Sequence, residues 1–525
     1  MVTYAQLRAA RPALWASAAY QYRAAATAVA ERWEEVVAEI VDIDDAWRGE
    51  VSQRLLARML VQRDALAAAF PALISVDQAL SDFAGTVTLA QAALAAAVPS
   101  TGSGITVDEH GVVRVAHDVD PVTRAHGAVV AAGIARALDL ATRADAEAAA
   151  RLAGAVDGFD PARQRPPSSV PPAGTPPGAV AGWWAGLSPD ERRWEIVQDA
   201  VVLTALDGIP ADARDQAARF LLYRQRAALR QRAAALAAPR GGGLPDGVRR
   251  QELASVDAEL AGIGATLARL DTDGGPRAYL LRLDPAHDGV VAAVGDPDRA
   301  GNVVTFVGGV GSGLHAAGAE LTWLDAIAGA SDAGSPTAET AVVGWIDYAA
   351  PPTLADAVTD RPARTAAGPL TTFEQGLRAT HGGGPAHETL LGYSYGSTVA
   401  GVAARDSTPD VDDIILVGSP GADVDTAARL HVAAGHVWAT AAANDVIRFA
   451  VNPAGRALGL LGAGRPDAMW FGTAPTSPAF GAHVFTSDPG SFFHPARAHE
   501  AYFDPGSTSL ANIARIVTGD GADVT

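Results

Sequence analysis

The chain has 525 residues, of which 49% are hydrophobic, and this length and apolar content predict two to four domains with buried cores. Its formal net charge of −19 argues against nucleic acid or an anionic membrane surface as the main partner, because both select a basic face. There is no cysteine and all 40 basic residues are arginine, which excludes disulfides, cysteine-ligated metals, cysteine nucleophiles, a P-loop lysine and a Schiff-base lysine.

The start of the chain lacks the pattern of a cleaved secretion signal, in which charged residues precede a short apolar run. Apolar stretches such as 128–135 are too short and too rich in alanine to span a bilayer. We therefore expect no transmembrane segment, and a protein that is cytoplasmic or is secreted without a cleaved signal peptide. Asp296-x-Asp298-x-x-Gly301 misses the spacing of a calcium loop, and neither a metal nor a cofactor is expected.

Residues 3–97 have the pattern of two long helices joined at a bend. Apolar residues recur at helical spacing along both, and Pro71 predicts a kink in the second. Residues 105–115 alternate apolar and polar around a turn, which indicates a β-hairpin, and a third helix is expected over 120–155. Residues 1–156 are therefore expected to form a helical domain with one small hairpin.

Trp47-Arg48-Gly49 lies at the bend between the two long helices. A glycine there can adopt the left-handed conformation that ends a helix, and the tryptophan can cover the open end of the hairpin. Two antiparallel helices with Trp-x-Gly at the bend resemble the WXG-type substrates and partners of type VII secretion. The resemblance implies a small helical secretion partner for residues 1–97, which would have to supply the companion Tyr-x-x-x-Asp/Glu motif. The alternative is an ordinary helical hairpin with a core tryptophan.

Paired prolines indicate the next boundary. Residues 157–179 contain Pro166-Pro167, Pro171-Pro172 and Pro176-Pro177 among serines and glycines, which predicts an extended, semi-rigid linker without a packed core. Residues 180–272 return to helical patterning and are expected to form a helical arm, or cap, packed on the domain that follows. The arginines of this arm are interpreted as a solvated helical face.

From residue 278 the pattern changes to short apolar runs. The first two flank His287-Asp288-Gly289 and predict a hairpin, and helical stretches separate most of the later ones. An antiparallel start followed by alternating strands and helices implies a mostly parallel sheet with helices on both faces. Residues 273–525 are therefore expected to adopt the α/β-hydrolase plan, with eight strands at 278–283, 290–294, 303–307, 341–346, 389–391, 414–417, 437–442 and 482–486.

Gly392-Tyr393-Ser394-Tyr395-Gly396 has the strongest chemical signal in the chain. A Gly-x-Ser-x-Gly pattern alone is weak among 54 glycines, but here an apolar run precedes it and a helical pattern follows it. A serine on so sharp a strand-to-helix turn is strained and exposes its Oγ at the carboxyl edge of the sheet. We predict that Ser394 is a nucleophile; the alternative is a glycine-rich turn with an inert serine.

A serine nucleophile needs a histidine to take its proton and an acid to orient that histidine. In this fold the acid follows the serine in the chain, after a late strand. Asp445 comes directly after the run 437–442 and meets this requirement. Asp423, one strand earlier, is the rival, although a loop aspartate that caps the next helix explains it better.

Five histidines follow Ser394, at positions 431, 436, 483, 494 and 499. The first is expected on a helix, the second in the turn after it, and the third in a strand. The base of this fold lies in the loop before the last helix, which is expected at 507–517. His494 and His499 both meet that condition, and position alone does not separate them.

Four further stretches occur together within residues 181–520. They are Leu206-Asp207-Gly208-Ile209-Pro210-Ala211-x-x-Arg214-Asp215, Gly295-Asp296-Pro297-Asp298, Gly392-Tyr393-Ser394-Tyr395-Gly396 and His499-x-x-Tyr502-Phe503-Asp504-Pro505-Gly506-Ser507. Together they resemble the actinobacterial α/β hydrolases catalogued as domain of unknown function 1023. The resemblance implies His499 as the base and Asp445 as the acid, and it says little about substrate because that family's function is itself mostly inferred from its fold.

The negative charge that develops on a substrate oxygen during acyl transfer needs backbone N–H donors. One is expected from Tyr395, directly after the serine. A second is expected from the glycine-rich loop 307–313 after the third strand, where Gly309 or Val310 is the candidate.

This loop departs from the resembled family at one point. That family usually has a proline here, whereas this chain has Gly308-Gly309. A phosphate-binding role for the loop is the alternative, and it is disfavoured because the chain has no lysine to complete it. Gly308, beside the second donor, and Tyr393, beside the nucleophile, are expected to contact the substrate.

Residues 446–479 are inserted between the last two predicted strands. Two apolar stretches, 457–462 and Met469-Trp470-Phe471, suit a lid or an acyl-binding wall. The alternative is a loop that packs on the core.

These features predict a serine hydrolase that cleaves a small-molecule or lipid ester, or a related acyl bond, through an acyl-enzyme. Ser394, His499 and Asp445 form the predicted triad. An acyltransferase would differ only in its acceptor. A hypothesis of a different class is an inactive or effector-type protein that binds a type VII secretion partner through its helical N-terminal domain.

Overall fold

The structure, a computed structural model, describes most of the chain. The described residues are 1–46, 49–98, 104–157, 159–160, 165–238, 245–272, 275–284, 287–335, 338–382, 384–449 and 467–525. Trp47 and Arg48 of the predicted bend lie outside these ranges, and so do residues 450–466 of the predicted insertion.

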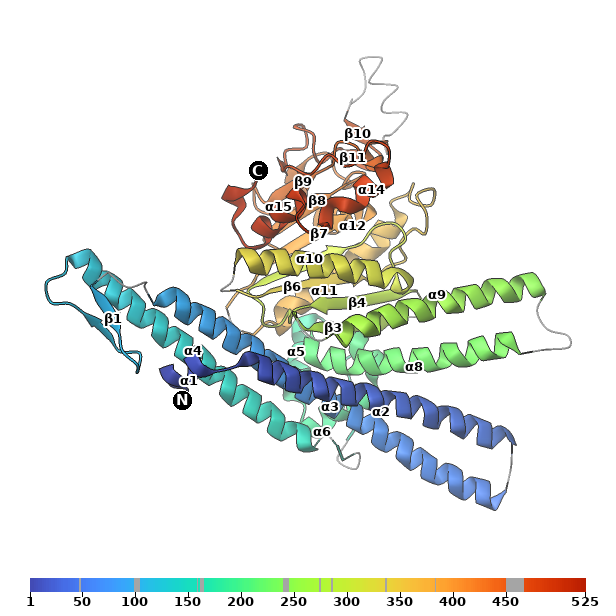
Figure 1. Ribbon diagram of the computed structural model, residues 1–525. Coiled ribbons are helices and arrows are strands. Elements are labelled where there is room, and N and C mark those ends of the chain that lie inside the picture. The colour runs from blue at the N-terminus through green and yellow to red at the C-terminus, as the bar shows by residue number, and fades with distance from the viewer. Residues whose placement is uncertain are drawn as a thin grey trace, which may run out of the picture.

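The first part of the chain is helical (Figure 1). Helices α2 and α3 pack along each other as a hairpin, and α4 packs on α3. Helix α3 continues through the buried Pro71. The predicted β-hairpin and third helix are confirmed. The elements are α1 Tyr4–Ala9, α2 Pro12–Ala46, α3 Glu50–Ala97, the antiparallel pair β1 Ile105–Val107 and β2 Val113–Val115, and α4 Pro121–Asp157.

Five helices lead from this part of the chain to the sheet. They are α5 Pro177–Gly186, α6 Pro189–Gln198, α7 Ala200–Ala205, α8 Ala211–Ala237 and α9 Asp246–Leu270. Helix α6 begins with the predicted cap, since Ser188 accepts a hydrogen bond from Glu191 N and Pro189 takes the first position. Helix α8 contacts both α3 and the first strand of the sheet, and Figure 1 shows the α2–α3 and α8–α9 pairs projecting from the sheet in the same direction.

The main sheet has eight strands in the order β12-β9-β8-β7-β5-β6-β4-β3. β3 and β4 are antiparallel to each other, β4 is antiparallel to β6, and the remaining neighbours are parallel. The central strands are buried along their whole length, which explains why they read as continuous apolar runs. The strands are β3 Ala278–Asp284, β4 Gly289–Val294, β5 Asn302–Val307, β6 Thr340–Ile346, β7 His387–Tyr393, β8 Asp413–Val417, β9 Val437–Thr440 and β12 His483–Val484.

Helices cover both faces of this sheet. On one face α10 Ala317–Gly334 and α15 Thr508–Val517 pack together and share an apolar core with α9. On the other face α11 Arg361–Thr380 packs against α12 Tyr395–Asp406. All eight predicted strands and this two-faced arrangement are therefore confirmed.

Short elements complete the C-terminal part. They are η2 Leu314–Ala316, η3 Ala427–Arg429, η4 Val446–Phe449, the pair β10 Ala468–Met469 and β11 Gly472–Thr473, α14 Pro495–Glu500, η5 Ala501–Phe503 and η6 Gly521–Asp523. His431, expected on a helix, lies after η3 with a φ of 49°. The prediction was wrong because the helix there is a single 3-10 turn.

Buried ion pairs join the first helices to the start of the sheet. Asp77 of α3 is fully buried and pairs with Arg23 of α2 at 2.9 Å and with Arg277, just before β3, at 2.8 Å. Asp215 of α8, also fully buried, pairs with Arg277 at 2.9 Å and with Arg219 at 2.7 Å. Because a buried carboxylate without a partner is costly, this network fixes how the helices sit on the sheet.

Helix α3 is the one described helix whose length and composition would allow it to cross a membrane. Its apolar window is 44% buried within the protein, and the helix contacts α2, α4 and α8. A helix in the core of a protein that spans no membrane can have the same length and apolar composition. The expectation of no transmembrane segment stays a prediction, as do the domain limits at 156, 179 and 272.

Candidate active site

Ser394 lies on the turn between β7 and α12. Its φ of 52° and ψ of −127° are rare outside glycine, so the backbone here is strained. The glycines on either side leave no room for a side chain. A Cβ at Gly392 would lie 2.5 Å from Ser397 Cα, and one at Gly396 would lie 2.0 Å from Val307 O. The Gly-x-Ser-x-Gly spacing is thus required by close backbone approach, as the motif predicts.

Asp445 and His499 meet at the carboxyl edge of the sheet. Asp445 follows β9 and is 1% exposed. Nδ1 of His499 lies 2.9 Å from Asp445 Oδ2 and 2.8 Å from Oδ1. With Nδ1 engaged by the acid, Nε2 is the nitrogen left to exchange a proton with a nucleophile.

The structure separates the two candidate histidines. His499 lies on the short helix α14, which Pro495 begins, rather than in the expected loop. His494 is exposed and lies at the N-cap of the same helix. It is His499, the residue that the family resemblance implied, that contacts Asp445.

Asp445 has further partners that hold its carboxylate in place. Tyr502 Oη donates to Asp445 Oδ2 at 2.5 Å, and Ile447 N donates to Oδ1 at 2.7 Å. The Tyr502 hydroxyl also accepts from Ala442 N at 2.7 Å. Burial, together with the negative charge of Asp445, raises the pKa of Tyr502 far above its usual range, so this hydroxyl stays a donor.

Contacts around Tyr393 and Gly418 bring the serine and histidine sides together. The Tyr393 ring stacks on the His499 ring with 5.0 Å between centroids, and Tyr393 Oη donates to His499 O at 2.9 Å. Ser394 N donates to Val417 O at 2.9 Å, and a Cβ on the next residue, Gly418, would lie 3.0 Å from His499 Cε1. Among the described residues no hydrogen bond joins Ser394 Oγ to His499; such bonds are often long before substrate binds.

The glycine-rich loop after β5 lies against Ser394. A Cβ at Gly309 would lie 2.7 Å from Ser394 Cβ and 3.2 Å from Ser394 Oγ, so only glycine fits here. Within the described chain, neither Gly309 N–H nor Val310 N–H donates to another residue. Tyr395 N–H opens α12 and has no acceptor within its own helix. Of the two candidates for the second donor, Gly309 is the one in contact with Ser394.

Gly308 and Tyr393, the two predicted substrate contacts, are packed inside the protein. Tyr348 Oη donates to Gly308 O at 2.7 Å. The space a Cβ would fill at Gly308 holds Ser312 Oγ and Glu320 Oε1, at 2.3 and 3.2 Å from that point. Tyr393 is 5% exposed and faces His499. Both residues shape the site, and direct contact with substrate stays a prediction.

Sequence reasoning gave no role to Tyr502, Tyr348 or Glu320. A role for Tyr502 could have been predicted from the sequence. It lies three residues after His499, in one of the four stretches that resemble the hydrolase family, and a spacing of three in a helix keeps two side chains close together. Tyr348 and Glu320 lie 40 and 12 residues after Gly308 in the chain, and no local pattern marks them. The rival acid Asp423 is bound elsewhere, since its carboxylate pairs with Arg405.

The described end of the predicted insertion packs on the core. Phe471 is buried and meets the Tyr395 ring edge-on at 5.7 Å, and Trp470 Nε1 donates to Val358 O at 2.6 Å. The stretch 457–462 lies outside the described residues. A cavity of about 470 Å³ has Ser419, Ile447 and Met469 among its walls, and none of Ser394, Asp445 and His499 lines it.

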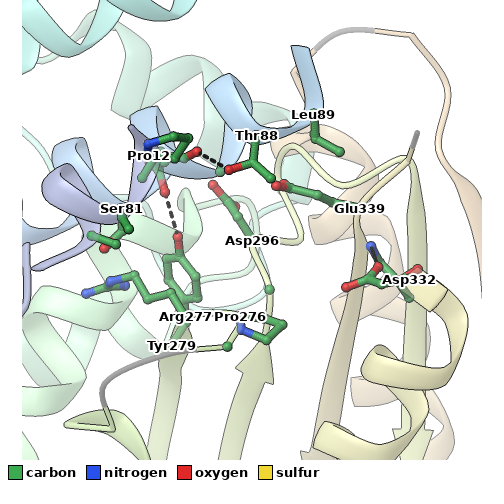
Figure 2. A pocket seen from close by; sticks show the side chains of 18 of the residues that line it. Pro12, Ser81, Thr88, Leu89, Pro276, Arg277, Tyr279, Asp296, Asp332 and Glu339 are labelled. Carbon is green, nitrogen blue, oxygen red and sulfur yellow. Dashed lines mark hydrogen bonds between the residues drawn. The ribbon is translucent and has the colours of Figure 1, made fainter. Parts of the chain in front are cut away.

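A second cavity, of about 490 Å³, lies far from Ser394 (Figure 2). It lies where α2 and α3 meet the starts of β3 and β6, and Figure 2 shows Asp296 and Glu339 turned toward the helix that carries Thr88. Burial raises the pKa of Glu339 to about 7. Among the described residues no group of three or more acidic or histidine side chains is placed to hold a metal ion.

Comparison with known proteins identifies the region around this site. Residues 284–454 match the family model described as alpha/beta hydrolase. That range includes the oxyanion loop, Ser394 and Asp445, and it ends before His499. No solved structure matches the chain.

Several mycobacterial proteins are similar to the chain. Uncharacterized protein Rv2079 of Mycobacterium tuberculosis is 29% identical over 410 residues, which cover 72% of this chain and 61% of that protein. Uncharacterized protein Mb0988c of Mycobacterium bovis is 34% identical over 189 residues, which cover 35% of this chain and 67% of that protein. The chain thus spans about three fifths of the length of the first relative.

Proposed function

For this chain, which belongs to the alpha/beta hydrolase family, we propose a serine hydrolase that cleaves an ester or a related acyl bond through an acyl-enzyme. The observation that supports this most is a pair of features at one edge of the sheet: the strained Ser394 next to Tyr393, whose ring stacks on His499, and the hydrogen bond between His499 and Asp445. Each member of a Ser-His-acid triad has its usual place in the chain order.

In the first step Ser394 Oγ attacks the carbonyl carbon of the substrate, and its proton passes to His499 Nε2. Asp445, fixed by Tyr502, balances the positive charge that His499 gains. The carbonyl oxygen becomes an anion and accepts hydrogen bonds from Tyr395 N–H and Gly309 N–H.

In the second step the bond to the leaving alcohol breaks, and His499 gives its proton to that alcohol. Water then attacks the acyl-serine while His499 accepts a water proton, and collapse of the second intermediate returns the proton to Ser394 Oγ. The products are one carboxylic acid and one alcohol, and no cofactor takes part.

The test is hydrolysis of a series of p-nitrophenyl esters of increasing acyl length. Ser394→Ala should lower kcat by about 10⁴-fold or more. Ser407→Ala, at the opposite end of the same helix, is the matched control and should keep the wild-type rate. A Ser394→Ala protein with at least a tenth of the wild-type rate would contradict the proposal.

A binding role for the helices is a second candidate, favoured by exposed apolar side chains on α3. Val51 is 78% exposed and Leu55, one turn later, is 45% exposed, so they share a face at the start of α3. Such a face suits a small helical partner of the WXG type. Copurification with a co-expressed partner of that type should be lost in Val51→Asp; equal recovery with both proteins would contradict this role.

A further inference from the structure

Glu320 is a buried acid beside the oxyanion loop that the proposed chemistry does not use. It lies in the first turn of α10 and is 4% exposed. Its Oε1 and the Ser312 hydroxyl lie side by side in the space next to Gly308, at 3.2 and 2.3 Å from the point that a Cβ on Gly308 would occupy. Gly308 therefore packs against the Ser312 hydroxyl and the Glu320 carboxyl.

The carbonyl oxygen of Gly308 is fixed by a hydrogen bond of its own. Tyr348, just after β6, is buried, stacks on Trp345 with an interplanar angle of 7°, and donates its hydroxyl to Gly308 O at 2.7 Å. The next residue along is Gly309, in contact with Ser394. Because Tyr348 fixes the Gly308 carbonyl, the contact of Glu320 and Ser312 with Gly308 determines where the N–H of Gly309 points.

We propose that Glu320 is a positioning residue for acyl transfer, which through Ser312 fixes the loop that presents Gly309 N–H to the oxyanion. This inference rests on the proposed function, since the loop needs such fixing only if it stabilises a negative oxygen. Preorganised donors aimed at a developing charge are usually a large contribution to catalysis. Small displacements of the loop therefore lower kcat more than they change KM.

The surroundings of Glu320 keep its carboxyl neutral. The acid borders a cavity of about 10 Å³ with mainly apolar walls, such as Val290 and Leu324, and within the described chain its Oε2 has no hydrogen-bond partner. Burial raises the pKa of Glu320 to about 8, the hydrogen bond from Ser312 lowers it, and the charge of Asp288 raises it further. At pH 7 the side chain is a carboxylic acid.

Other ionisable groups near Glu320 come from several elements. They are Asp288 in the β3–β4 turn, His315 paired with Asp288, Glu259 of α9 facing Asp288, Tyr348 after β6 and Tyr393 of β7. Burial raises the pKa of both tyrosines, so they stay neutral through pH 9. Above pH 8 Glu320 becomes a carboxylate next to the loop, and its negative charge opposes the oxyanion.

The experiment measures kcat and KM between pH 6 and 10 with the best p-nitrophenyl ester, for wild type, Glu320→Gln and Glu374→Gln. Wild-type kcat should fall about tenfold between pH 7.5 and 9.5 at nearly constant KM. Glu320→Gln should lower kcat less than tenfold at pH 7 and remove the alkaline fall. Glu374, a buried acid of α11 on the other face of the sheet, is the matched control, and its variant should keep the wild-type profile.

The inference is overturned if Glu320→Gln keeps the alkaline fall, or if Glu374→Gln removes it equally. Should Glu320→Gln fail to fold, Ser312→Ala decides: a severalfold lower kcat at pH 7 with unchanged KM supports the inference, and an unchanged kcat overturns it. A wild-type protein without esterase turnover contradicts the proposed function instead, so the two failures are distinct.

Discussion

Buried polar groups lie near the starts of the strands and at their carboxyl ends. The cluster around Asp77 and Asp215 and the cluster around Ser394 differ in whether the central groups already have a hydrogen-bond or ion-pair partner. Near the strand starts, Asp77 and Asp215 are each paired with two arginines. At the carboxyl ends, Asp445 is fully engaged by His499 and Tyr502. Ser394 Oγ and Gly309 N–H, in contrast, have no partner in the described chain.

The same difference separates the sequence motifs that pack the fold from the motifs proposed to take part in the reaction. Two of the stretches that suggested the family serve packing: Asp298 accepts from Ala211 N and Thr380 Oγ1, and Gly208, with φ of 96°, allows Pro177 O to approach. The other two contain Ser394 and His499, the proposed nucleophile and base. A buried carboxylate paired with arginines fixes how the elements pack, whereas a strained serine without a hydrogen-bond partner is available for reaction.

The largest expected effect comes from the triad acid. Asp445→Asn should lower kcat about 10⁴-fold, because an amide no longer sets the tautomer of His499 or balances its positive charge. Ester hydrolysis at pH 7.5 measures this. The control is Asp423→Asn, whose carboxylate pairs with Arg405 away from the histidine and which should keep at least half the activity. Equal losses in both variants would remove the distinction between the two acids.

The next largest effect concerns the cluster at the strand starts. Asp215→Ala removes the 2.7 Å partner of the buried Arg219 and one of the two carboxylates that pair with the buried Arg277, and it should lower the free energy of unfolding by about 3–5 kcal/mol. Urea unfolding followed by circular dichroism measures it. Glu35→Ala removes an exposed partner of Arg32 on α2 and should leave the midpoint unchanged. An Asp215→Ala protein as stable as wild type would contradict a structural role for this cluster.

A smaller effect is expected at the hydroxyl that holds the acid. Tyr502→Phe removes the hydrogen bond to Asp445 and leaves Ala442 N without its acceptor. A hydrogen bond to a charged group contributes about 1.5–3 kcal/mol, so kcat should fall roughly tenfold to a hundredfold with KM little changed. Steady-state kinetics decide, and a rise in KM at constant kcat would show that Tyr502 serves substrate binding instead.

The smallest effect is the pH dependence of stability. Burial raises the pKa of Glu374 to about 7, and burial with the charge of Glu374 raises that of Glu388 to about 9. The unfolded chain releases these protons near pH 4.5 and the folded chain only at higher pH, so the contribution of these two groups to stability is fully present below pH 4.5 and is lost as the pH rises through about 7 and about 9.

Each of these two groups contributes at most about 1.4 kcal/mol per pH unit to that decline. Urea unfolding at pH 5, 7 and 9 measures it. Glu374→Gln should make the decline shallower between pH 5 and 7. A stability that rises over this range would show that these carboxyls are ionised in the folded protein.

Much of the hydrolase region follows from local sequence patterns. The eight strands were predictable because buried strands read as apolar runs, and Ser394 because its turn requires glycines at 392 and 396. Position in the chain does not decide whether His494 or His499 is the candidate base, and only a spatial contact with Asp445 separates them. Glu320 and Tyr348 could not be predicted, since their roles depend on contacts across the fold that no spacing encodes. The bend at 47–48 lies outside the described residues, so the secretion resemblance stays a prediction.

The most direct test of the central claim is labelling with a fluorophosphonate probe, which reacts with an activated serine, followed by mass spectrometry of the modified peptide. The wild-type protein should be labelled on Ser394, His499→Ala should be labelled far more slowly, and Ser394→Ala should not be labelled. Equal labelling of wild type and Ser394→Ala, or no labelling of the folded wild type, would contradict the assignment of Ser394 as a nucleophile.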